Sequence, residues 1–234
     1  STLSSSSAAS DVYKRQPQNR ASIENRISYI KNCPDCGTEL VRIEGEAQHY
    51  CPNVDGCSTQ IIGKIQHYIA RNAMDIDGLG SETVSLFFYE GLIKNIADLY
   101  TLKEEQLLPL ERMAQKSVDN LLLGIKNSKK QPFAKVLFGL GVRFVGATVA
   151  KRLANHFGTI TNLMKASQEE LIMVDDIGHR IAQSLVKFFE NPKNIELVER
   201  LIAYGVTMED EIKALSSKIS VSYTHLRAHE TRGN

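Results

Sequence analysis

The sequence predicts a mainly α-helical protein in which a small four-cysteine module precedes a compact helical domain. Two observations carry this prediction. All four cysteines of the 234-residue chain lie between positions 33 and 57, and a pattern of two helices joined by a turn then recurs at intervals of about 32 residues. Hydrophobic residues make up 42% of the chain, which is ample for a packed core.

The cysteines form two closely spaced pairs. Two residues separate Cys33 from Cys36, and five separate Cys51 from Cys57. Two such pairs joined by a hairpin-length loop can supply the thiolates of a tetrahedral zinc site that has no open position for catalysis. Two disulfides are the alternative, but nothing in the chain suggests secretion. We therefore expect a structural Zn²⁺ bound by Cys33, Cys36, Cys51 and Cys57.

The segments around the cysteines predict a strand and a helix. Val41 and Ile43 alternate with polar residues, which favours a short strand between the two pairs. After Cys57, apolar residues at helical spacing predict a helix that packs this module onto the following domain; they are Ile61, Ile62, Ile65 and Ile69. Neither His49 nor His67 is expected to bind the metal, because the thiolates already complete its ligand shell.

Four tripeptides mark the internal repeat: Gly78-Leu79-Gly80, Arg112-Met113-Ala114, Phe144-Val145-Gly146 and Asp176-Ile177-Gly178. The middle residue is apolar and the last is Gly or Ala. Apolar residues four and seven positions later have the spacing of a buried helix face; the pairs are Val84 and Phe87, Val118 and Leu121, Ala150 and Leu153, and Ala182 and Leu185. Each unit is therefore predicted to be two helices joined by a tight turn, with the small residue where the turn enters the second helix.

Such a turn can bind a phosphate through its main chain. The N–H groups at the start of a helix are unpaired and lie at the positive end of the helix dipole, and a glycine leaves them uncovered. This is the chemistry of the helix-hairpin-helix motif, which positions a protein on DNA without reading its sequence. An α-solenoid that binds proteins has a similar period, but the signature aromatic and proline positions of tetratricopeptide repeats are not found.

Charge is unevenly distributed, although the formal net charge is only +1. Between Arg112 and Arg152 there are nine Lys or Arg residues and one acidic residue. In the segments before and after this block, acidic residues outnumber Lys and Arg. This basic block is either a polyanion-binding surface or a solvated helical face. The expected DNA contacts are the hairpin glycines and the lysines and arginines near them: Gly78, Gly80, Lys116, Lys129, Lys130, Arg143, Gly146, Lys151, Arg152, Gly178 and Arg180. Around the first hairpin, Asp75, Asp77 and Glu82 would repel phosphate.

The two ends of the chain differ from the rest. Residues 1–30 are predicted to be a leader outside the fold and residues 211–234 a linker and tail, because both resemble translated adapter sequence. The predicted domains are then 31–72, the zinc finger with its linking helix, and 73–210, the helix-hairpin-helix domain. No apolar run approaches the ~20 residues of a membrane span and there is no hydrophobic signal region, so we expect a cytoplasmic protein with no membrane partner.

From about Lys31 to Asp210, these parts and their order resemble the bacterial NAD-dependent DNA ligase family. The resemblance lies in the segments CPDCGTELVRIEGEAQHYCPN, IQHYIARNAMDIDGLG, FGLGVRFVGATVAKRLANHFG and LIMVDDIGHRIAQSLVKFFENPKN. It implies that the four cysteines are zinc ligands and that the hairpins bind the minor groove and backbone of nicked duplex DNA. The family seals nicks in replication and repair: a lysine takes AMP from NAD and passes it to the 5′-phosphate, and the 3′-hydroxyl then displaces it.

The chain departs from the family pattern because it has no K-x-D-G motif that could supply the adenylated lysine. The nicotinamide-binding, adenylation and OB-fold domains would precede Lys31, and a BRCT domain would follow near Leu215. We therefore expect a monomeric DNA-binding segment without catalytic or cofactor-binding residues, inactive by itself, with NAD and Mg²⁺ serving only the full-length enzyme. The alternative is a stand-alone helix-hairpin-helix protein of DNA repair or recombination, and a protein-binding helical repeat comes third.

Overall fold

The computed structural model describes residues 29–42, 45, 47–111 and 113–209. Several sequence predictions lie outside these residues, namely most of the leader 1–30, the tail 211–234, and the positions Ile43 and Arg112. The chain divides into two compact units that meet in sequence between Thr59 and Gln60. The division falls near the start of the predicted linking helix, whereas the sequence predicts a first domain that includes this helix and ends at residue 72.

The first unit is a small two-stranded module. Strand β1 (Val41–Arg42) pairs in antiparallel register with β2 (His49–Tyr50), so that Val41 lies opposite Tyr50. The predicted strand at Val41 is confirmed, but this side chain is 44% exposed and β1 has no buried face. Among the described residues up to Thr59, the buried side chains are those of Cys33 and Cys57. This unit therefore has almost no apolar core of its own.

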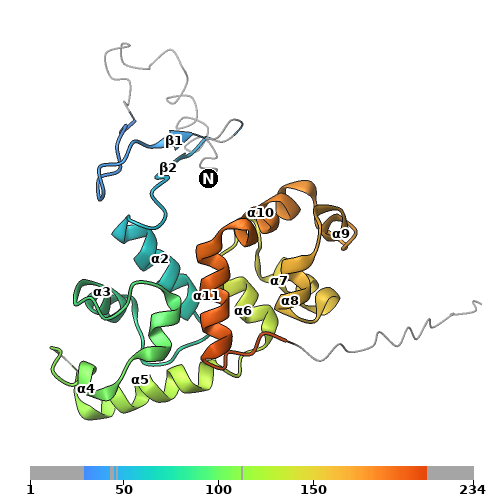
Figure 1. Cartoon of the computed structure of the whole chain (residues 1–234). Helices are drawn as coiled ribbons and strands as arrows, with labels where there is room; N and C mark the ends of the chain where they lie inside the picture. The colour runs from blue at the N-terminus through green and yellow to red at the C-terminus, as the bar shows by residue number, and fades with distance from the viewer. Residues whose placement is uncertain (1–28, 43–44, 46, 112, 210–234) are drawn as a thin grey trace, which may run out of the picture. The chain divides into compact units, whose positions relative to one another are not determined.

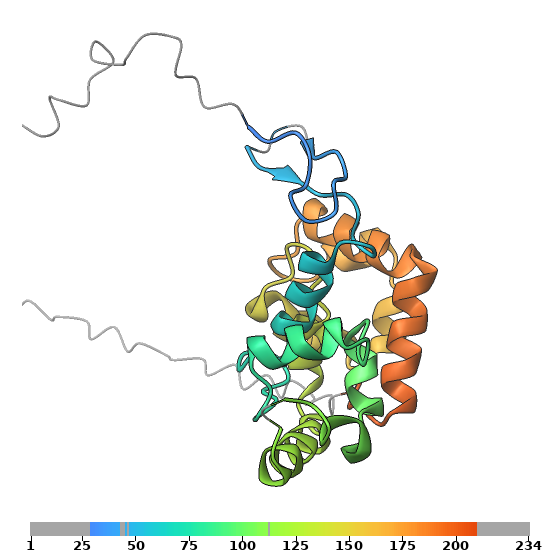
Figure 2. The same cartoon turned by 90° about the vertical axis from the view of Figure 1, so that its left-hand side faces the viewer.

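The second unit consists of helices, as predicted (Figures 1 and 2). They are α2 (Ser58–Ile69), α3 (Ser81–Tyr89), the 3₁₀ helix η3 (Ile96–Thr101), α4 (Glu104–Leu107), α5 (Gln115–Ser128), α6 (Phe133–Gly139), α7 (Ala147–Phe157), α8 (Ile160–Lys165), α9 (Gln168–Ile172), α10 (His179–Glu190) and α11 (Pro192–Ala203). None of the helices in the described part of the chain has the length and hydrophobicity that a bilayer crossing requires.

The repeat predicted from sequence is confirmed in register. The first helices of the four units are α2, α4, α6 and α9, and the second helices are α3, α5, α7 and α10. Each second helix begins directly after the small residue of its tripeptide, so that this residue is the extended N-cap; the four are Gly80, Ala114, Gly146 and Gly178. All eight residues predicted to form the buried helix faces, four and seven positions later, are fully buried.

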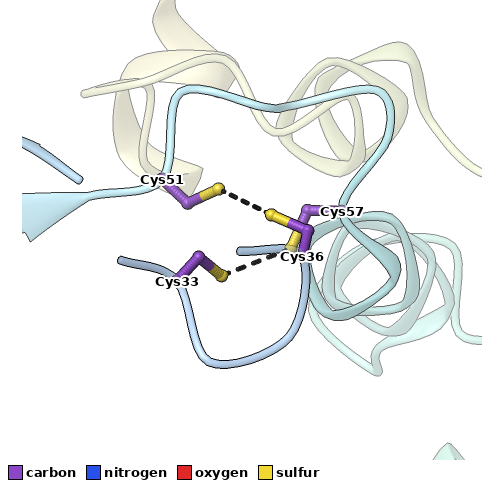
Figure 3. Close-up of side chains that lie close together, drawn as sticks. All are labelled: Cys33, Cys36, Cys51 and Cys57. Carbon is purple, nitrogen blue, oxygen red and sulfur yellow. Dashed lines mark hydrogen bonds between the residues drawn. The ribbon is translucent and has the colours of Figure 1, made fainter. Parts of the chain in front are cut away.

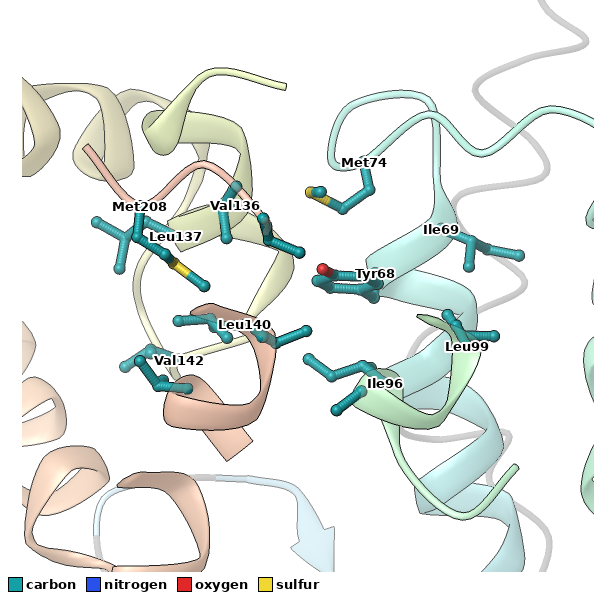
Figure 4. Packing of buried hydrophobic residues seen from close by; sticks show 14 of the residues in the cluster. Tyr68, Ile69, Met74, Ile96, Leu99, Val136, Leu137, Leu140, Val142 and Met208 are labelled. Atoms are coloured by element: carbon teal, nitrogen blue, oxygen red, sulfur yellow. The ribbon is translucent and has the colours of Figure 1, made fainter. Parts of the chain in front are cut away.

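A single apolar cluster joins the repeats. Tyr68 in α2 is fully buried, and its hydroxyl lies 2.9 Å from that of Tyr100 in η3. Figure 4 shows Tyr68 and Met74 facing side chains of α6 such as Val136. The predicted stripe on α2 is present, with Ile65 and Ile69 buried, but it belongs to the core of the second unit.

Polar contacts tie distant parts of this unit together. Arg200 in α11 donates to Asp98 Oδ1 at 2.7 Å, and this aspartate also closes the capping box that begins η3 at Asn95. After α11, Thr207 donates both its N–H and its hydroxyl to the carbonyl oxygen of Lys129, at 2.9 and 2.8 Å. These contacts fix the last helix and the chain that follows it against the first two hairpins.

Candidate metal centre and nucleic-acid interface

The four cysteine thiols converge in the first unit. Their sulfur atoms all lie within 4.8 Å of one another, and the side chains point into one small volume (Figure 3). Two short distances each join a cysteine of the first sequence pair to one of the second: 3.5 Å between the sulfurs of Cys36 and Cys51, and 3.9 Å between those of Cys33 and Cys57. All four are free cysteines, so the disulfide alternative is not adopted.

This arrangement fits a zinc ion. A Zn–S bond of about 2.3 Å in tetrahedral geometry places the sulfur atoms roughly 3.8 Å apart, close to the distances between the paired thiols. No histidine joins this cluster among the described residues. His49 stacks on Tyr29 with ring centroids 5.4 Å apart, and His67 Nε2 lies 3.0 Å from the carbonyl oxygen of Phe138.

In the turn that carries Cys33 and Cys36, called here the first knuckle, hydrogen bonds favour a thiolate at Cys36. Its sulfur lies 3.2 Å from Thr38 Oγ1. Hydrogen bonding to the side chain and then to the main chain of Thr38 lowers the pKa of Cys36 from 9.0 to about 6. Burial raises the pKa of Cys51, so the two thiols of this close pair differ in how readily they ionise. A thiolate is the form that binds metal.

Asp35 connects the first knuckle to the start of α2. Its Oδ2 atom accepts hydrogen bonds from the Thr59 N–H at 3.0 Å and from the Ser58 hydroxyl at 2.7 Å, and Cys57 Sγ lies 3.3 Å away. The hydrogen bonds from Thr59, Ser58 and Cys57, in that order, lower the pKa of Asp35 to about 2. A carboxylate that accepts hydrogen bonds at a helix N-terminus is also favoured by the helix dipole.

Asp35→Ala should loosen this connection. The first turn of α2 loses its acceptor, and Cys57, which directly precedes that turn, loses its fixed orientation. We expect about 10- to 100-fold weaker zinc retention in competition with a chromogenic chelator, as for other groups that orient metal ligands. Asp35→Asn, which keeps an acceptor oxygen, is the matched control and should lose less. Equal chelator sensitivity of all three proteins would contradict this role for Asp35.

Three of the four hairpin N-caps are glycines that leave space above the turn. A side-chain carbon added at Gly80, Gly146 or Gly178 would meet no atom within 4 Å. All three residues are exposed, as is Ala114 at the N-cap of α5. The first N–H groups of α3, α7 and α10 are therefore not covered by a side chain of the N-cap residue.

Gly78 has a different environment. It has a positive φ of 79°, and a side-chain carbon there would lie 3.3 Å from the main chain of Leu121 in α5. On the other side of this contact, an added carbon at Gly124 would lie only 2.4 Å from the carbonyl oxygen of Asp77. The turn of the first hairpin thus packs against α5, and these two glycines permit that close approach.

The predicted basic contacts divide into two groups. Lys116, Lys130, Arg143, Lys151 and Arg180 are exposed. Lys129 and Arg152 are partly buried and contact other parts of the unit. Lys129 Nζ lies 5.5 Å from the centroid of the Tyr100 ring, and Arg152 forms an ion pair with Asp176 in the fourth hairpin turn. Both side chains therefore already have partners within the helical unit.

The sequence analysis assigned no role to Phe144, whose ring centroid lies 4.9 and 4.8 Å from the guanidinium carbons of Arg143 and Arg180. It also missed the packing role of Gly124, for which a signal existed, because an isolated glycine within a helical pattern often marks a close backbone approach.

Comparison with known proteins matches both units. Residues 32–58 match the NAD-dependent DNA ligase C4 zinc finger domain, and residues 135–198 match the helix-hairpin-helix motif. DNA ligases of Christiangramia forsetii and Flavobacterium psychrophilum are 54% and 55% identical over 90% and 86% of this chain, and that of Bacillus licheniformis is 47% identical over 88%. The chain spans about 31% of the length of each of these relatives.

The fold and the two sites define a protein with a four-cysteine zinc finger and tandem helix-hairpin-helix motifs. The matches over nearly the whole chain go one step further. The chain belongs to the bacterial NAD-dependent DNA ligase family, as a segment that carries this zinc finger and these hairpins.

Proposed function

We propose that this chain is the DNA-binding segment of an enzyme that seals single-strand nicks in duplex DNA with NAD as the source of AMP. The observation that carries the proposal is the set of open glycine N-caps at hairpins three and four, next to the exposed cations Arg143, Lys151 and Arg180. Main-chain N–H groups and cations at the same turns form the chemistry that binds phosphate oxygens.

Within this function each unit has its own task. The hairpins bind the sugar-phosphate backbone along the minor groove, without base recognition, because the contacting groups are main-chain amides and flexible cations. The finger binds one structural Zn²⁺ through Cys33, Cys36, Cys51 and Cys57, which stabilises it and leaves no ligand position for catalysis. Of the eleven predicted DNA contacts, Gly78, Lys129 and Arg152 have packing roles that account for them without DNA.

The activity belongs to the whole enzyme. The adenylated lysine, NAD and Mg²⁺ act in other parts of the ligase, and this segment contributes affinity for the nicked duplex as a monomer in the cytoplasm. The identity to DNA ligases over 90% of the chain favours this function over a stand-alone repair protein.

Exchanging Arg143 and Lys151 together for alanine should weaken DNA binding without unfolding the protein. Both side chains are exposed, so the melting temperature should change little. Each lost phosphate contact should reduce the salt dependence of binding by about one unit of slope, and the affinity should fall roughly tenfold or more. Fluorescence anisotropy with a labelled duplex at several salt concentrations measures both quantities.

Lys187→Ala is the matched control, because Lys187 is an exposed lysine in the last turn of α10, far along that helix from its hairpin turn. It should leave the affinity nearly unchanged. Binding by the wild type that does not respond to salt would contradict the proposal, and so would an equal loss of affinity in the control and in the double variant.

A further inference from the structure

Phe144 combines an unfavourable backbone conformation with an exposed aromatic side chain. Its φ is +67°, in the left-handed region that residues with a bulky side chain rarely adopt. Its ring is 44% exposed, although phenylalanine is most often buried. A costly conformation that persists in a folded protein is often retained for a function of that residue.

The equivalent positions in the repeat show what this turn requires. The first residue of the tripeptide is left-handed in the first, third and fourth hairpins, and the residues are Gly78, Phe144 and Asp176. Glycine adopts this conformation without cost, and aspartate tolerates it better than most residues. Asp176 also forms an ion pair with Arg152, which gives it a structural role. Phe144 therefore stands where the turn itself would favour a glycine.

Two guanidinium groups lie close to the ring of Phe144. The guanidinium carbons of Arg143 and Arg180 lie 4.9 and 4.8 Å from its centroid. Arg180 belongs to the first turn of α10, so the ring lies where the third and fourth hairpin turns meet. The open N-caps Gly146 and Gly178 begin the second helices of the same two hairpins.

We propose that Phe144 contacts the nucleic acid directly, with its ring against the apolar faces of deoxyribose and the base edges in the minor groove. This inference rests on the proposed DNA binding. Between two phosphates the surface of a DNA strand is sugar, which is apolar, so a ring between two phosphate-binding turns meets a surface of matching chemistry. Apolar side chains, phenylalanine among them, are also what many minor-groove proteins insert into that groove.

Phe144→Gly tests the proposal, because it removes the ring and relieves the backbone strain in one change. The melting temperature should stay within a few degrees of wild type, since the relief offsets the lost contacts with the arginines. Affinity for a labelled duplex should fall about tenfold, the size found when an aromatic contact to a nucleic acid is removed. The salt dependence should not change, because no phosphate contact is lost. Tyr89→Ala, which removes an exposed ring at the end of α3, is the control and should bind like wild type.

The outcomes separate this proposal from the proposed function. Suppose that wild type binds duplex DNA and that Arg143→Ala weakens this binding while Phe144→Gly does not. The ring then makes no DNA contact, and only this inference fails. A salt slope reduced in Phe144→Gly as in Arg143→Ala would show that the ring acts by positioning arginines, which also overturns it. If wild type does not bind duplex DNA, the proposed function and this inference fail together.

Discussion

Removal of zinc should unfold the finger and leave the helical unit folded. Between Asn32 and Thr59 the buried side chains among the described residues are two of the proposed ligands, Cys33 and Cys57, so the metal takes the place of an apolar core. Binding of structural zinc contributes about 10–16 kcal/mol in comparable small fingers, far more than β1 and β2 can supply. The unit from Gln60 onward has its own continuous core and does not depend on the ion.

Cys36→Ser should have the same effect as a chelator. Limited proteolysis should cut the finger in both cases, while the helical circular dichroism signal and the main melting transition persist. Val41→Ser, a change at an exposed position of β1, is the control and should retain both zinc and protease resistance. Elemental analysis of the wild type gives the zinc content directly. A protein purified without zinc, yet resistant to proteolysis in the finger, would show that the thiols stabilise the unit in another way.

Gly124→Ala should destabilise the helical unit strongly, against the usual trend. In a helix interior alanine is more favourable than glycine by about 1 kcal/mol. At Gly124 the new methyl group would lie 2.4 Å from the carbonyl oxygen of Asp77 and 3.2 Å from its nitrogen, and these main-chain atoms can move only with the whole first hairpin turn. Overpacking of this kind costs roughly 1–3 kcal/mol, and the hairpin turn at Gly78 should separate from α5.

The control is Gly63→Ala in α2, where an added methyl group meets no atom within 4 Å. This variant should be as stable as wild type or more so. Thermal unfolding compares the two variants, and hydrogen exchange between residues 75 and 80 reports on the first turn. If Gly124→Ala gained stability like Gly63→Ala, the close packing of the first hairpin on α5 would be wrong.

Local patterns in the sequence were sufficient to predict the framework of both units. The spacing of Cys33, Cys36, Cys51 and Cys57 predicted their convergence, because two short knuckles can close only around a shared centre. The repeat predicted the N-caps and the buried faces, because each depends on residues at most seven positions apart in one helix. The fold class was therefore predicted correctly.

The remaining features depend on how distant segments meet. Lys129 belonged to a basic block in the sequence, and only the position of η3 reveals that it lies over Tyr100. Arg152 likewise meets Asp176 because the third helix pair packs on the fourth turn. Gly78 was chosen for its place in a hairpin, whereas its conformation and its contact with α5 explain the glycine without a ligand. Apart from the isolated glycine at position 124, which marks a close backbone approach, the sequence carries no signal for these contacts.

The open turns at Gly80, Gly146 and Gly178 have a consequence for mutational studies of this surface. Every amino acid except proline carries the same main-chain N–H, so an alanine scan would leave these groups in place and would assign the whole interaction to arginines and lysines. Amide-to-ester replacement in the first turn of α7 would remove one donor at a time. Such replacement of peptide bonds, in place of side chains, would measure how much of the proposed DNA affinity comes from main-chain N–H groups.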